Sequence, residues 1–173
     1  MKKTLAILGG AVGALAGVWL VLSLCGVIGM SRDDMIDRVL EEDRKMRYSA
    51  SIHIPSDEMA AVLQYSDDRE VFQCTIYVNR PGFSFGWFEC YRGADERVKD
   101  GVLECHVEGL GSVALFSMNR PGVTRIEAEG ELSILEEYPA DSPFATVLWE
   151  GLGDYVMYDE AGNIVEAEKL EVE

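Results

Sequence analysis

The chain has 173 residues, with 31 acidic against 15 basic side chains and a net charge of −16. This length allows one domain with its own core and leaves little room for a second. So negative a chain would be repelled by polyanions, and we expect no nucleic-acid partner. The four cysteines and two histidines lack the close spacing of zinc sites or redox motifs, so we expect neither a metal nor a cofactor.

An uncharged, largely apolar run covers residues 4–30, directly after Lys2 and Lys3, and every acidic residue follows it. About 20 apolar residues suffice to cross the hydrocarbon core of a bilayer. We therefore predict that residues 1–30 form an uncleaved N-terminal transmembrane anchor, in contact with the lipid bilayer through residues 4–30. The two lysines place the N-terminus in the cytoplasm and the C-terminal domain outside, as in a single-pass protein of the cell membrane.

Two processing events compete with the uncleaved anchor. Residues 14–16 (Ala-Leu-Ala) fit the small-x-small site of a signal peptidase, but cleavage there would leave an apolar mature N-terminus. Residues 22–25 (Leu-Ser-Leu-Cys) resemble a lipoprotein signal for lipidation at Cys25, although Leu24 is larger than that pattern allows. We therefore predict that the anchor is not cleaved.

Three glycines recur every four residues inside the predicted anchor. They are Gly9, Gly13 and Gly17. In a helix they share one face, where the absence of side chains lets a second helix approach closely. We therefore predict this face as a candidate site of helix pairing and self-association.

A helix is expected directly after the anchor. Ser31 and Asp34 are placed as in an N-terminal capping box, and apolar side chains follow with helical spacing. These side chains are Met35, Ile36, Val39, Leu40 and Met46. We predict a short amphipathic juxtamembrane helix within residues 31–47, helical over 32–46. Its other face carries charges of both signs, so we expect a stalk or a helix packed on the domain.

From residue 48 the hydrophobic period changes to two, which indicates β-strands. In the first strand, residues 48–54, His53 alternates with the apolar residues, so we expect it to face outward. Ser56 is expected to cap a short helix over residues 57–63. Further strands are predicted at residues 71–79, 83–92, 102–107, 113–118, 123–135, 146–149, 155–158 and 164–170.

A tetrapeptide repeat suggests how these strands are connected. Asn-Arg-Pro-Gly occurs at residues 79–82 and at 119–122, and Gly162 continues the same 40-residue step. Pro-Gly suits the centre of a tight turn, and each glycine separates two apolar segments. We therefore predict three related β-hairpins. The fold class is mainly β: an antiparallel β-sandwich built from hairpins over residues 48–173, extracytoplasmic, preceded by one transmembrane helix and one short amphipathic helix.

The sequence contains one catalytic pattern, Gly-x-Ser-x-Gly at residues 82–86, centred on Ser84. A nucleophile elbow of this form needs a helix after the serine, whereas the residues that follow here are aromatic and strand-like. Asp95 and His106 would have to serve as the acid and the histidine of a catalytic triad. His106 is expected on a solvated face with Glu104. We therefore predict no enzymatic activity, and a serine hydrolase is the third alternative for function.

The densest group of aromatic residues surrounds Ser84. Four of them are Phe83, Phe85, Trp87 and Phe88. Phe88 breaks their alternation, so we expect either a β-bulge at residues 86–88 or an exposed aromatic patch that suits a protein or glycan partner. One bulged residue would also bring Cys74 opposite Cys90. We predict a disulfide between these two cysteines, with Cys105 free in the core.

Together these features predict a membrane-anchored extracytoplasmic β-domain that acts as a binding or assembly module, with a protein partner or a second copy of itself. An apolar helix that leads through an amphipathic stretch to a sheet domain also resembles the plan of a pseudopilin. The resemblance implies, as an alternative, a structural subunit of an envelope assembly. The glycine before the apolar run and the glutamate five residues into it, which belong to that family's motif, are absent here.

Overall fold

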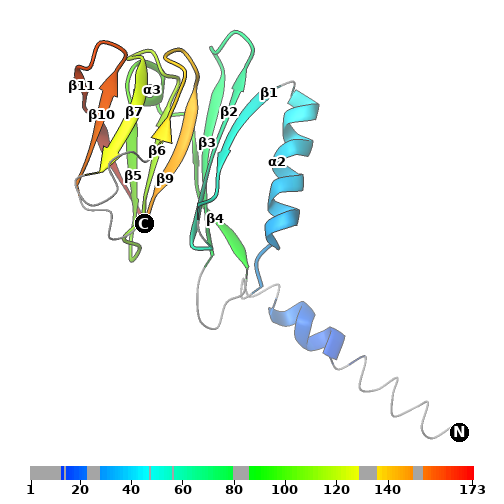
Figure 1. Cartoon of the computed structure of the whole chain (residues 1–173). Coiled ribbons are helices and arrows are strands. Elements are labelled where there is room, and N and C mark those ends of the chain that lie inside the picture. The colour runs from blue at the N-terminus through cyan, green and yellow to red at the C-terminus, as the bar shows by residue number, and fades with distance from the viewer. Residues whose placement is uncertain are drawn as a thin grey trace, which may run out of the picture.

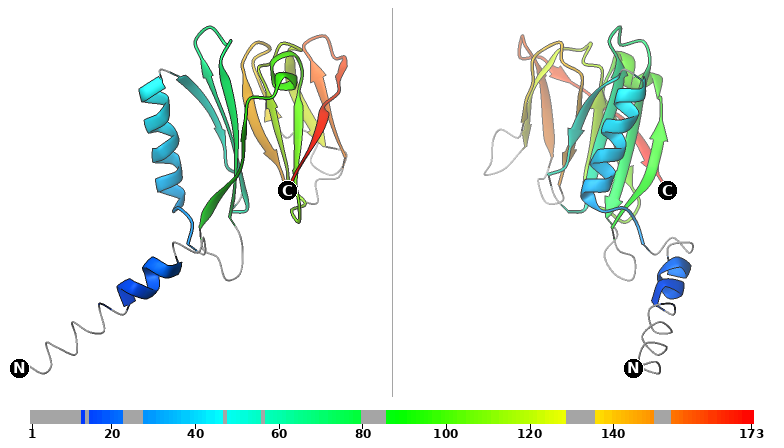
Figure 2. Two further views of the ribbon diagram at one scale, coloured as in Figure 1. Left: turned by 180° about the vertical axis from the view of Figure 1, so that it is seen from behind. Right: turned by 90° about the vertical axis from the view of Figure 1, so that its right-hand side faces the viewer.

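The computed structural model describes residues 13, 15–22, 28–46, 48–55, 57–79, 86–128, 136–149 and 154–173. Over these residues the protein is mainly β, with three four-stranded sheets stacked in layers and a helix, α2 (Arg32–Met46), on the outside (Figure 1). Figure 2 shows that α2 covers the face of the first sheet that points away from the other two sheets.

The first sheet has the strand order β1-β2-β3-β4 and is antiparallel throughout. Its strands are β1 (Tyr48–His53), β2 (Met59–Ser66), β3 (Phe72–Asn79) and β4 (Trp87–Gly93). A one-turn helix, α3 (Glu96–Asp100), leads from β4 into the central sheet, and Asp95 caps it by accepting a hydrogen bond from the Arg97 backbone N–H at 3.0 Å.

The central sheet has the order β12-β5-β6-β9, and the third has the order β11-β10-β7-β8. The strands of the central sheet are β5 (Leu103–Val107), β6 (Val113–Ser117), β9 (Phe144–Leu148) and β12 (Glu168–Val172). Those of the third sheet are β7 (Val123–Ala128), β8 (Glu136–Glu137), β10 (Tyr155–Asp159) and β11 (Ile164–Val165). Strand β12 pairs parallel with β5, so the central sheet is mixed, whereas the predicted sandwich was antiparallel.

Three hydrophobic clusters hold these layers together. The first joins α2 to the first sheet, the second fills the space between the first and central sheets, and the third lies between the central and third sheets. In β6, Ala114 and Phe116 point into the second cluster and Leu115 into the third. Strands β6 and β9 of the central sheet are thus buried on both faces, which explains why they read as apolar runs rather than as alternating patterns.

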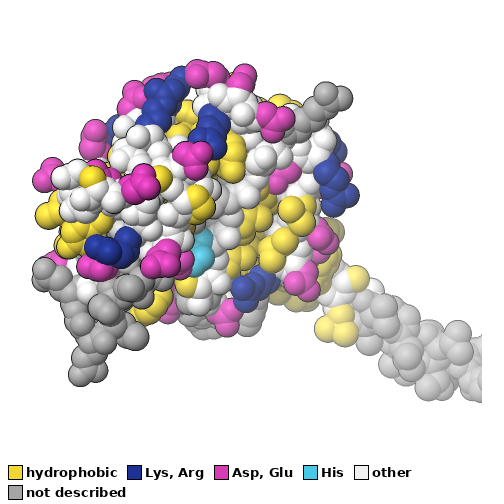
Figure 3. All heavy atoms as spheres, turned by 45° about the horizontal axis from the view of Figure 1, so that its top comes forward, with side chains coloured by type: hydrophobic (Ala, Val, Ile, Leu, Met, Phe, Trp, Pro, Cys, Tyr) yellow, Lys and Arg dark blue, Asp and Glu magenta, His cyan; other side chains and the backbone are white. Residues whose placement is uncertain are grey.

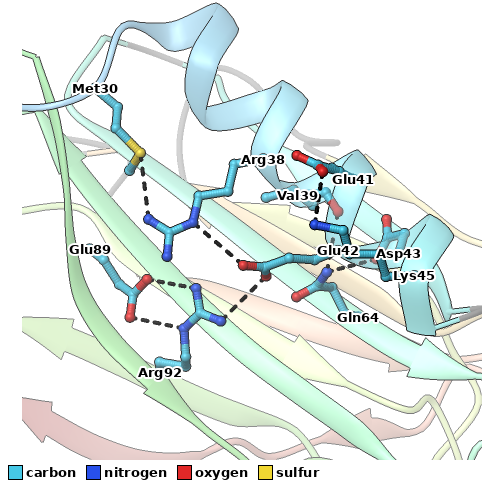
Figure 4. A network of polar contacts seen from close by, with 10 residues as sticks. All are labelled: Met30, Arg38, Val39, Glu41, Glu42, Asp43, Lys45, Gln64, Glu89 and Arg92. Carbon is cyan, nitrogen blue, oxygen red and sulfur yellow. Dashed lines mark hydrogen bonds and ion pairs between the residues drawn. The ribbon is translucent and has the colours of Figure 1, made fainter.

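Helix α2 matches the predicted amphipathic helix and is packed on the domain. The Ser31 hydroxyl accepts a hydrogen bond from the Asp34 backbone N–H at 3.1 Å, as the capping box requires. The buried face of the helix includes Met35 and Val39. On its polar face, Glu42 lies 3.4 Å from Arg92 of β4, an ion pair that ties the helix to the far edge of the first sheet (Figure 4).

The segment before α2 is joined to β4 by an isolated β-bridge. Met30 N–H donates to the Trp87 carbonyl at 3.0 Å, and Trp87 N–H donates to the Met30 carbonyl at 2.8 Å. Two glycines make this close approach of backbones fit, since a Cβ on Gly29 or on Gly86 would lie 2.6 Å from a carbonyl oxygen of the opposite strand.

The predicted anchor lies mostly outside the described residues. Residues 13 and 15–22 are helical and exposed, and no helix in the described part of the chain is both long and apolar enough to cross a membrane. Of the predicted pairing face, Gly9 falls outside the described residues, whereas Gly13 and Gly17 have no atom within 4 Å of where a Cβ would stand. Helix pairing therefore stays a prediction.

The helix predicted at residues 57–63 is wrong, because residues 59–66 form strand β2. All five residues from Met59 to Leu63 are completely buried, with α2 on one side and the central sheet on the other. A strand covered on both faces shows no alternation, so the local helix signal from Ser56 was misleading.

The second predicted hairpin is also wrong. Strands β3 and β4 pair as predicted, as do β10 and β11, but β6 and β7 belong to different sheets. Residues 119–122 carry the chain from the central sheet to the third. The Asn119 side chain holds this crossover by accepting from Val123 N–H at 2.7 Å and donating to the Pro139 carbonyl at 3.2 Å.

His53 does not face outward as predicted. Its Nδ1 accepts a hydrogen bond from the Val147 backbone N–H of β9 at 2.9 Å, and its Nε2 lies 3.2 Å from Glu136. Burial lowers the pKa of His53, against the opposing effect of the Glu136 carboxylate. The alternation along β1 was predicted correctly, but its polar side meets the edge of the central sheet instead of solvent.

Candidate functional site

A cleft of about 590 Å³ opens between the central and third sheets. Its wall is apolar and comes from β6, β9, β10 and β11. The wall side chains include Val113, Leu148, Met157, Ile164 and Val165. The polar side chains of the lining are Glu104, His106, Asp154, Tyr155, Glu166 and Lys169. Concave, mostly apolar sites with a few convergent polar groups are where proteins bind small molecules.

Glu104 is the centre of the polar group. Its side chain is only 8% exposed, and three polar side chains lie close to its carboxylate. The Tyr155 hydroxyl donates to Oε2 at 2.6 Å, His106 Nε2 lies 2.5 Å from Oε1, and the Lys169 ammonium lies 3.7 Å from the same oxygen. A buried carboxylate persists only with such partners, because burial alone strongly disfavours the charged form.

Strand pairing brings these residues together. Along β5, Leu103 and Cys105 point into the core between the first and central sheets, so Glu104 and His106 point the other way, toward the third sheet. The parallel pairing of β12 places Lys169 directly beside Glu104. The solvated face that the sequence predicted for Glu104 and His106 is instead covered by the third sheet.

The tyrosine of this cluster is held as a hydrogen-bond donor. Burial raises the pKa of Tyr155 far above its ordinary value, and the hydrogen bond and negative charge of Glu104 raise it further. Tyr155 therefore stays protonated at any physiological pH. Lys169 differs, since its side chain is 69% exposed and its ammonium is too far from Glu104 for a hydrogen bond.

The cluster can bind a polar group and can hold a proton, and the lining residues that the structure describes include no serine, threonine or cysteine. The hydrolase partners proposed from the sequence are engaged elsewhere. Asp95 caps α3 and pairs with Arg97 at 2.8 Å, while His106 pairs with Glu104. Ser84 lies outside the described residues, so its role stays a prediction.

The predicted disulfide between Cys74 and Cys90 is wrong. Cys74 is a free thiol, and the residue opposite it on β4 is Gly93. The strand pair does contain a bulge, but at Cys90 rather than at residues 86–88, because the register shifts between the pairs that flank that residue. Cys105 is free in the core, as predicted, and burial raises its pKa to about 12.

Only part of the predicted aromatic patch can be located. Phe83 and Phe85 fall outside the described residues. Trp87 is 4% exposed and packs in the cluster beneath α2, so it belongs to the core. Phe88 is half-buried at the start of β4. An exposed patch that includes Trp87 is therefore not formed.

No family model, curated protein or solved structure matches this chain. Its function must accordingly be argued from the cleft and from the apolar N-terminal segment. The sequence pointed to neither Glu104 nor Tyr155 as functional, because the cleft combines residues from β5, β10 and β12 that only the sheet topology brings together.

Proposed function

We propose that this protein is a membrane-anchored, extracytoplasmic β-domain that serves as a binding module and has no catalytic activity. The observation that carries the proposal is the cleft around Glu104, which combines an apolar wall with a buried carboxylate that accepts a hydrogen bond from Tyr155. Such a site suits the recognition of a small molecule.

The apolar N-terminal segment supports the anchoring. Its described helical part exposes one large apolar side chain after another. Examples are Leu15 at 71%, Trp19 at 60% and Val21 at 57% exposure. Apolar side chains gathered at this density need a partner or a lipid environment, because a water-exposed patch of this kind is rare on soluble proteins.

Non-covalent contacts join the end of this segment to the domain, in addition to the chain itself. The two hydrogen bonds between Met30 and Trp87 and the ion pair between Glu42 and Arg92 fix residues 30–46 against the first sheet. With the anchor in the bilayer, the domain would thus begin close to the membrane surface. Figure 3 shows acidic and basic side chains interspersed on the face that it views, as expected of a surface that remains in water.

Cell fractionation tests this proposal. The full-length chain is expected to stay in the membrane pellet after alkaline carbonate and to be released by detergent. Protease added to the outside of intact cells is expected to digest the domain. A soluble chain truncated near residue 16, or a domain protected from external protease, would contradict the anchoring.

Two other functions make different predictions. A pseudopilin-like subunit would be processed just before the apolar run, giving a mature N-terminus near residue 4. A serine hydrolase would be labelled by a fluorophosphonate, and Ser84→Ala would abolish the label. We expect an unprocessed N-terminus and no label.

A further inference from the structure

We propose that the cleft between the central and third sheets binds a small organic cation, one that combines an amine with an apolar or aromatic body. This inference rests on the proposed function only in that a binding module needs a binding site. The charges of the lining select the sign of the ligand. Among the described lining residues, the carboxylates of Glu104, Asp154 and Glu166 outnumber the basic side chains of His106 and Lys169.

Glu104 provides the anchor point for the amine. A carboxylate has about four lone-pair directions, and here Tyr155 and His106 are the only partners at hydrogen-bond distance from this carboxylate in the described part of the chain. The Lys169 ammonium stands 3.7 Å away on a largely exposed side chain, so it can turn toward solvent when another cation enters. Because Glu104 is buried, a charge-assisted hydrogen bond to it is stronger than one at the surface.

The apolar part of the ligand is suggested by exposed side chains at the same cleft. Trp149 is 43% exposed and Ile164 is 65% exposed, and both line it. Large apolar residues are seldom left open to water without a reason when they gather at one concavity. The Trp149 ring also offers a face to a cation, which adds a favourable electrostatic contact. A carboxylate ligand would lose the electrostatic contact with the ring face and would meet the three acidic side chains.

The experiment measures binding to the full-length chain in detergent micelles by isothermal titration calorimetry. Phenethylamine is the probe, and two compounds of the same shape serve as controls: 2-phenylethanol, which is neutral, and 3-phenylpropionate, which is negative. We expect phenethylamine to bind about tenfold or more tightly than 2-phenylethanol, and 3-phenylpropionate not to bind. Similar affinities for all three compounds, or no binding of phenethylamine, would overturn the proposal.

Variants locate the bound amine. Glu104→Gln should weaken the binding of phenethylamine about tenfold and leave the binding of 2-phenylethanol unchanged. Lys169→Gln removes the competing ammonium, so it should strengthen phenethylamine binding by a few-fold, and weaker binding in this variant would overturn the proposal. Asp154 and Glu166 are exposed at the rim of the cleft. The double variant Asp154→Asn, Glu166→Gln should weaken the binding of phenethylamine by a few-fold.

The variants remain decisive if one of them fails to fold. Should Glu104→Gln lose its circular dichroism spectrum, Lys169→Gln and the rim variant still predict changes of opposite sign. The anchoring is tested separately by fractionation. If the chain fractionates with the membrane but does not bind phenethylamine, the cation site is refuted and the proposed anchoring is not affected.

Discussion

Replacing Gly86 with alanine tests how the chain enters the domain. Gly86 has a φ of +95°, and a Cβ there would lie 2.6 Å from the Met30 carbonyl oxygen. The backbone conformation alone costs an alanine about 1–2 kcal/mol. The clash would also separate Met30 from Trp87, and their two hydrogen bonds contribute about 0.5–1.5 kcal/mol each. We therefore expect Gly86→Ala to lower the free energy of unfolding by about 2–5 kcal/mol.

Two further variants separate the contributions. Gly109 has a φ of +79° and open space around it, so Gly109→Ala should cost only the conformational part, about 1–2 kcal/mol. Gly29 is not among the glycines with positive φ, but its Cβ would lie 2.6 Å from the Trp87 carbonyl oxygen. Gly29→Ala should therefore lower the free energy of unfolding only by the contribution of the two bridge hydrogen bonds, about 1–3 kcal/mol.

Urea unfolding of the full-length chain in detergent, followed by far-ultraviolet circular dichroism, gives the three free energies. Tryptophan fluorescence adds a local probe, since Trp87 is the buried tryptophan at the bridge. Gly86→Ala should lower the free energy of unfolding more than either control does. If Gly86→Ala is no worse than Gly109→Ala, the contact between residues 29–30 and 86–87 does not stabilise the protein.

Three more outcomes follow from the structure. Tyr155→Phe removes a donor to the buried Glu104 carboxylate and should lower the free energy of unfolding by about 1.5–3 kcal/mol, measured with urea. The pKa of His53 is lowered by burial, so the unfolded chain takes up a proton more readily than the folded chain as the pH falls through 6.5; the stability should be full above that pH and should decrease below it. Cys74 and Cys105, whose pKa values are raised by burial, should resist iodoacetamide at about pH 8 until the chain unfolds, as mass spectrometry would show.

Each of these outcomes has a clear opposite. A change below about 0.5 kcal/mol in Tyr155→Phe would mean that the hydroxyl does not stabilise the carboxylate. The loss of stability below pH 6.5 should shrink in His53→Asn, and an unchanged pH profile would assign it to other groups. Equal alkylation of native and unfolded protein would show that Cys74 and Cys105 are accessible.

Local patterns in the sequence predicted α2 and β1 well, whereas the local helix signal at residues 57–63 was misleading. Ser31 and the apolar spacing after it located α2 to the residue, and the alternation along residues 48–54 separated the two sides of β1 correctly. Both signals depend only on neighbours within a few residues, through helix capping and side-chain direction.

Local patterns could not predict the features that depend on how the sheets stack. Whether the second face of β1 or β5 meets water is decided by another sheet, so both His53 and Glu104 were expected to be solvated. The repeated Asn-Arg-Pro-Gly likewise forms different connections, because Asn119 bonds to a distant backbone carbonyl at Pro139 in the crossover between sheets. The cleft shares this origin, since Lys169 reaches Glu104 only through a parallel strand pair.

That parallel pair also constrains the order of folding. The central sheet supplies a face to both of the large cores between sheets, and its edge is completed by β12, residues 168–172, paired with β5 more than 60 residues earlier. Strand β12 is synthesised after every other strand that the structure describes. Strand β5 therefore keeps an unpaired edge until β12 has been made, and so long-range a pairing is expected to make folding slow.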